Sequence, residues 1–228
     1  MLKKILLIAI VVLLSISLFG CNKPEETIEE SSEEPPENTA VAIVNGTEIM
    51  LFDLFKIYRN MNVSYMQRGV DITDDEITAQ ILEEALNTLI SYELLLQNAV
   101  KNGYQVSRDE INEQIETYKS EFETEQDFID SLELQQLTLD SLVERLEKEM
   151  LISEYVQDVI GEPQVLEEEI IEMYQQYKEQ REDIPEYEEY KWELEQQLRN
   201  NKFSQKVNEL IEKLKSESTI EIFREETN

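Results

Sequence analysis

Apolar residues recur every three to four positions through most of the chain, which predicts amphipathic α-helices. The first runs from about Leu51 to Gln67, and the second begins at Thr73, whose side chain is expected to form a capping box with Glu76. Five more helices are predicted, one opening with a capping box at Ser107, a short one after Thr124, and three over residues 138–160, 165–178 and 185–216. The pattern therefore predicts a mostly α-helical protein, with an N-terminal helical lobe of four helices over about residues 50–135 and long helices over about 138–216.

Two short β-prone runs, residues 40–44 and 47–49, flank the dipeptide Asn45-Gly46. This dipeptide tolerates positive φ at both central positions of a tight turn, so a β-hairpin is expected. A two-stranded hairpin alone is marginally stable in water and needs a further strand or a helix to cover it. Residues 219–223 alternate between polar and apolar side chains, and we expect this closing strand to join the hairpin and complete a domain of residues 40–223.

The N-terminus has the order of parts found in a lipoprotein signal peptide. Lys3 and Lys4 precede an apolar stretch, residues 5–18, and Gly20 stands directly before Cys21, the single cysteine of the chain. The stretch is shorter than the ~20 residues that span a bilayer, although a permanent transmembrane anchor is the alternative. We expect residues 1–20 to be removed and Cys21 to carry fatty acids such as palmitate, which anchors the protein to the extracytoplasmic face of a bacterial cell membrane.

Residues 21–39 contain seven glutamates and three prolines but few large apolar side chains. Such a composition predicts a disordered acidic linker, which would hold the folded part at a distance from the lipid surface. Residues 224–228 form a short polar tail.

Composition argues against most catalytic chemistry. The formal net charge is −31, which disfavours a nucleic-acid partner, and the chain has no histidine to serve as a general base or zinc ligand. Residues 71–75 begin like a calcium loop, but Glu76 and Leu82 occupy the positions that require glycine and glutamate. We expect no catalytic residue, no metal site and no cofactor.

The first predicted helix is apolar over roughly two-thirds of its circumference, more than a surface helix needs. It is either buried on two sides or presents part of this surface as a groove for apolar polypeptide segments, to which methionine and aromatic side chains adapt well. The candidate binding residues are Phe52, Phe55, Tyr58, Met61, Tyr65 and Met66. A site beside Tyr174, Tyr187 and Trp192 is the alternative.

The order of these patterns resembles the SurA-type chaperone module, which PrsA-type foldase lipoproteins share and to which the substrate-binding part of trigger factor is related. The resemblance covers nearly all of residues 40–223. The stretches that carry it are residues 42–49, 89–99, 103–111, 194–198 and 211–222.

Family members with foldase activity carry a parvulin prolyl isomerase domain before the closing helix, and the interval here, residues 179–184, has no room for a domain of ~90 residues. The resemblance therefore implies a holdase chaperone that binds unfolded or newly exported proteins without isomerase catalysis. Two other readings stay open: an envelope adaptor for one dedicated protein partner, and a degenerate prolyl isomerase. The oligomeric state is left open.

Overall fold

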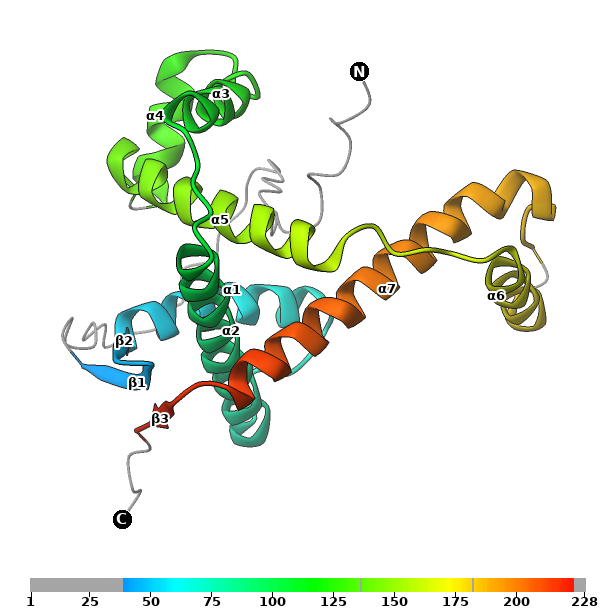
Figure 1. Cartoon of the computed structure of the whole chain (residues 1–228), viewed down its shortest axis with the longest axis horizontal. Helices are drawn as coiled ribbons and strands as arrows, with labels where there is room; N and C mark the ends of the chain where they lie inside the picture. The colour runs from blue at the N-terminus through cyan, green and yellow to red at the C-terminus, as the bar shows by residue number, and fades with distance from the viewer. Residues whose placement is uncertain (1–38, 136, 182, 224–228) are drawn as a thin grey trace, which may run out of the picture. The chain divides into compact units, whose positions relative to one another are not determined.

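The computed structural model describes residues 39–135, 137–181 and 183–223, all within the compact unit Glu34–Asn228. This part is mostly α-helical, which confirms the expected fold class, and its elements can be followed in Figure 1. The elements are β1 (Ala40–Val44), β2 (Thr47–Met50), α1 (Leu51–Gln67), α2 (Asp75–Lys101), α3 (Arg108–Lys119), α4 (Glu125–Leu134), α5 (Leu139–Ile160), α6 (Glu167–Gln180), α7 (Tyr187–Ser216) and β3 (Ile220–Ile222). The expected signal peptide, Cys21, nearly all of the linker and the tail lie outside the described residues.

The three described strands form one antiparallel sheet in the order β2-β1-β3. β1 pairs with β2 through the hairpin and with β3 near the other end of the chain, with Ala42 opposite Ile222 and Val44 opposite Ile220. Figure 1 shows the pairing as a blue strand beside a red one. The expectation that the C-terminal strand joins the hairpin is confirmed.

Asn45 fixes the place where the two ends of the domain meet. Asn45 and Gly46 have φ values of 51° and 91°, as the tight turn requires. The Asn45 backbone N donates to the carbonyl of Thr219 at 2.8 Å, and the backbone N of Thr219 donates to Asn45 Oδ1 at 2.9 Å. Asn45 Nδ2 donates to Gln97 Oε1 on α2 and to Ser218 Oγ. One side chain thus joins the hairpin, the closing segment and α2.

The helix starts follow the capping signals, with one correction. Ser107 caps α3 as expected, and Thr124 and Thr138, where the next helices were expected to start, cap α4 and α5. At α2, however, the cap is Asp74 and not Thr73: Asp74 Oδ1 accepts from the backbone N of Glu76 and of Ile77. Thr73 instead donates to Asp71 Oδ1, because the preceding aspartate forms a local turn with it.

The four helices expected in the N-terminal lobe do not share one core, because α2 packs on the second half of α5 while α3 and α4 pack on its first half. α3 and α4 pack on the first half of α5 in one core, whose buried residues are Ile111, Ile115, Phe128, Leu132, Leu142 and Leu146. α2 instead shares a second core with the sheet, the second half of α5 and the end of α7. α5 therefore belongs to two cores.

A third core lies between α6 and the first half of α7, around Ile170, Tyr174 and Leu194. α6 ends at Gln180 and α7 begins at Tyr187, slightly after Pro185, which precedes the helix cap and lies outside the first turn. The connection between α6 and α7 spans residues 181–186.

We predict that Asn45→Ala lowers the free energy of unfolding by about 2–4 kcal/mol, because alanine loses the side-chain bonds and is strained at positive φ. Asn45→Gly keeps the backbone geometry and loses only the bonds, so about half of that loss is expected. Urea unfolding followed by circular dichroism measures both. Equal stability of the alanine variant and the unmodified protein would contradict the role given to this residue.

Candidate client-binding surface

α1 packs on α2 and on the hairpin strands through one side. Leu54 is its single fully buried residue, with an exposed fraction of 8%. Near the other end of the helix, Tyr65 Oη donates to Glu84 Oε2 on α2 at 2.7 Å. This hydrogen bond to a carboxylate raises the pKa of Tyr65, and the Arg68 guanidinium lies over the same ring, 4.4 Å from its centroid. α1 is therefore attached along one side and is not enclosed on two.

Of the six candidate residues, none is fully buried. Met66 is 51% exposed, and the other five, Phe52, Phe55, Tyr58, Met61 and Tyr65, are half-buried. Since the residues of an α-helix advance by about 100° each, the six divide between two sides of α1. Tyr58, Met61 and Tyr65 lie within about 40° of Leu54, on the side that faces α2.

The remaining three candidates lie at about 100° to 160° from Leu54 and turn away from α2. Val63, which is 50% exposed, lies at about 180° from Leu54, beside Phe52 on the same side, although it is absent from the candidate set derived from sequence. Its spacing of eleven residues from Phe52, about 20° around the helix, is the signal that identifies it. We call Phe52, Phe55, Val63 and Met66 the outer face of α1. It is a half-exposed apolar surface next to a helix–helix contact.

The alternative site beside Tyr174, Tyr187 and Trp192 is mainly a packing arrangement. Tyr174 is buried, and its ring contacts that of Tyr187 edge to face, with the centroids 5.3 Å apart. Tyr187 Oη donates to Glu167 Oε1, which also accepts from Lys191 Nζ. Trp192 alone is open to solvent, with 72% of its surface exposed.

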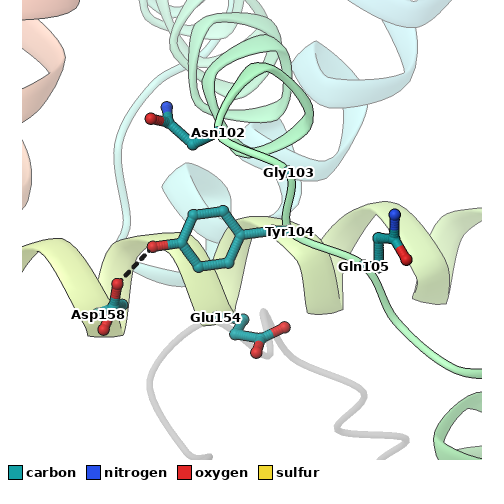
Figure 2. A pocket seen from close by; sticks show the side chains of 6 residues that line it. All are labelled: Asn102, Gly103, Tyr104, Gln105, Glu154 and Asp158. Carbon is teal, nitrogen blue, oxygen red and sulfur yellow. Dashed lines mark hydrogen bonds between the residues drawn. The ribbon is translucent and has the colours of Figure 1, made fainter.

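An open depression of about 500 Å³ lies where the α2–α3 connection passes α5. Figure 2 shows Tyr104 crossing it and donating from its hydroxyl to Asp158 Oδ2, with Asn102, Gln105 and Glu154 around them. The bond to Asp158 and partial desolvation raise the pKa of Tyr104 to about 12. The lining is polar and acidic, so this depression is not the expected apolar groove.

Within residues 39–135, 137–181 and 183–223, no three acidic, histidine or cysteine side chains are grouped closely enough to hold a metal ion. None of the helices in the same ranges has both the length and the apolar character needed to cross a bilayer.

Comparison with known proteins gives two findings. The family model of the SurA-like N-terminal domain matches residues 1–156. Among solved structures, the chain is similar to one from a study of PEB4 and Cj1289, described there as two structurally related SurA-like chaperones of Campylobacter jejuni. The match has a TM-score of 0.56 at 12% sequence identity and covers 82% of this chain and 100% of the other. The search of curated proteins gave no match.

We predict that Tyr65→Phe loosens α1 from α2, because the bond to Glu84 is lost while the ring remains. Hydrogen exchange measured by mass spectrometry should become severalfold faster in α1 and stay unchanged in α4. Tyr118→Phe is the matched control, because Tyr118 is also half-buried but its hydroxyl has no hydrogen-bond partner in the described part of the chain. Unchanged exchange in α1 would show that the bond does not hold the helix.

Proposed function

Because the chain belongs to the SurA-like N-terminal domain family, we propose that it is a holdase chaperone, which binds unfolded or newly exported polypeptides on the outer face of α1 and releases them unchanged. The family suggests a chaperone role. The observation that supports this particular surface is the grouping of Phe52, Phe55, Val63 and Met66 on one half-exposed side of a helix that only one fully buried residue anchors.

The outer face suits weak and reversible binding. Two phenylalanines, a valine and a methionine offer an apolar area well below that of a stable protein–protein interface, and a methionine side chain adapts to different partners. Release then needs no energy source. The formal charge of −31 on the whole chain would oppose aggregation of the chaperone with its bound client.

The proposal includes a lipid anchor at Cys21 and a location at the extracytoplasmic face of a bacterial cell membrane. The sequence alone supports this anchor and location, through the basic start, the apolar stretch of residues 5–18 and Gly20 before the cysteine. Anchoring would place the binding surface where exported chains emerge.

The proposed mode of action involves no catalysis. The short connection between α6 and α7 and the absence of histidine from the sequence support binding without prolyl isomerisation. An adaptor for one folded partner would use the same surface. Half-exposed side chains that can change conformation, such as Met66, favour binding of many different unfolded segments over binding of one folded partner of fixed shape.

We predict that the double variant Val63→Thr, Met66→Gln loses much of the ability to suppress aggregation. Polar isosteres on the outer face should cost roughly 1–2 kcal/mol of binding free energy, or about 5- to 30-fold in affinity. The measurement is light scattering of several unrelated unfolded proteins at near-stoichiometric ratios, with residues 22–228 as the chaperone. These residues contain all three cores and the whole sheet, so they include every contact on which the fold depends.

The matched control is Val159→Thr, Leu166→Gln. These two residues are 51% and 56% exposed, slightly more than Val63 and Met66, but they lie near the junction of α5 and α6. This control should suppress aggregation like the unmodified protein. Failure of the unmodified protein on all clients would refute the proposed function, and equal loss in both variants would refute the assignment of the surface.

A separate prediction concerns Cys21. Cys21→Ser should abolish incorporation of a radiolabelled fatty acid and shift the protein from the membrane fraction to the soluble or secreted fraction, because the acylated thiol is lost. Persistence in the membrane fraction without label would favour an uncleaved transmembrane anchor.

A further inference from the structure

α1 differs from the other described helices in its charge. It carries Lys56 and Arg59 against a single acidic residue, Asp53, whereas α2 to α6 each contain more acidic than basic residues and α7 contains equal numbers. A helix with an excess of basic residues stands out in a chain whose net charge is −31. The position of these two cations therefore calls for an explanation.

Both cations border the outer face of α1. Lys56 follows Phe52 by four residues, and Arg59 lies four residues from both Phe55 and Val63, so each cation is one turn from an apolar neighbour. Arg59 is exposed and Lys56 is half-buried. Within the described residues, neither forms an ion pair with a carboxylate, whereas Lys191 and Lys202 on α7 both do. Among the described residues, the two cations of α1 therefore have no carboxylate partner.

We propose that the outer face of α1 selects unfolded polypeptide segments that combine apolar side chains with carboxylates. The apolar residues of the segment would pack on Phe52, Phe55, Val63 and Met66, while its aspartates or glutamates would pair with Lys56 and Arg59. This inference rests on the proposed chaperone function and names the class of client for the same surface.

The physical reason lies in the charge of the protein as a whole. A strongly acidic chaperone repels acidic clients at long range, so it would exclude them unless its binding surface provided opposite charge locally. Two cations beside apolar side chains provide that charge, and they would also fix the direction in which a segment lies. Since the pairs would be partly exposed to solvent, the preference should weaken as the salt concentration is raised well above about 0.15 M.

The experiment uses residues 22–228 and three fluorescent 15-residue peptides with identical apolar positions. Their remaining positions carry glutamate, glutamine or lysine. Fluorescence anisotropy at about 0.15 M salt, where a Debye length of about 8 Å screens the long-range repulsion by the rest of the chain, should show the acidic peptide binding at least about fivefold more tightly than the neutral one, with the lysine peptide weaker than the acidic one. The double variant Lys56→Gln, Arg59→Gln should remove this preference while leaving binding of the neutral peptide within about twofold.

The matched control is Lys148→Gln, Lys206→Gln, which removes the same charge from exposed positions on α5 and α7. This control should keep the preference for the acidic peptide. If it loses the preference as fully as the α1 variant does, net charge and not the outer face sets the selectivity, and the proposal is overturned.

The remaining outcomes separate this proposal from the proposed function. Suppression of aggregation together with equal affinity for acidic and neutral peptides would overturn the selectivity and leave the chaperone function standing. No binding of any peptide and no suppression of aggregation would overturn both proposals.

Two results would assign the outer face to another occupant. Binding of anionic phosphatidylglycerol vesicles that depends on Lys56 and Arg59, with no preference among the peptides, would assign the face to lipid. A chain of residues 34–228 that binds the acidic peptide tenfold more tightly than residues 22–228 would assign it to the chain's own glutamates. Each of these last two results would overturn the proposal.

Discussion

The side chain of Asn45 links the two ends of the domain where β1 pairs with β3, and this closure is the constraint that positions the remaining elements. It occupies a turn position with positive φ, and it bonds to Gln97 of α2 and to the segment that leads into β3. Residues 173 and 174 positions apart are thereby held together. Because a contact between the ends of a long chain carries a large entropy cost of closure, specific hydrogen bonds at this point matter more than their individual strength suggests. The sheet that they complete covers one side of the central core.

The long helices α5 and α7 connect the central core to the other two cores. Each of these long helices contributes buried residues to two clusters: Leu146 and Val156 of α5 lie in different cores, as do Leu194 and Leu214 of α7. α1 contributes no buried residue to any of the three clusters, and its attachment depends on Leu54, the hydroxyl of Tyr65 and the half-buried side chains on the same side. An element with few buried contacts is among the less stable parts of a fold, and binding surfaces are commonly built from such elements.

Apolar side chains and basic charge meet on this weakly anchored helix. The outer face of α1 would offer clients an apolar area too small for tight binding. Lys56 and Arg59 would add positive charge there, opposite in sign to the net charge of the whole chain. Membership in the SurA-like family is consistent with this arrangement. The polar depression around Tyr104 has a different character, since acidic groups line it and its tyrosine already donates to Asp158.

The sequence by itself determined every helix to within a few residues, because the apolar spacing and the capping residues act locally, as at Ser107 and Thr138. It also determined that the final strand would join the hairpin, since Asn45-Gly46 and the alternation of residues 219–223 allow few other arrangements. Only the tertiary structure decided which side of α1 turns away from α2, and that α3 and α4 pack on α5 and not with α1. A helical pattern states that a face is apolar, but the identity of the surface that covers it depends on contacts between residues far apart in the chain.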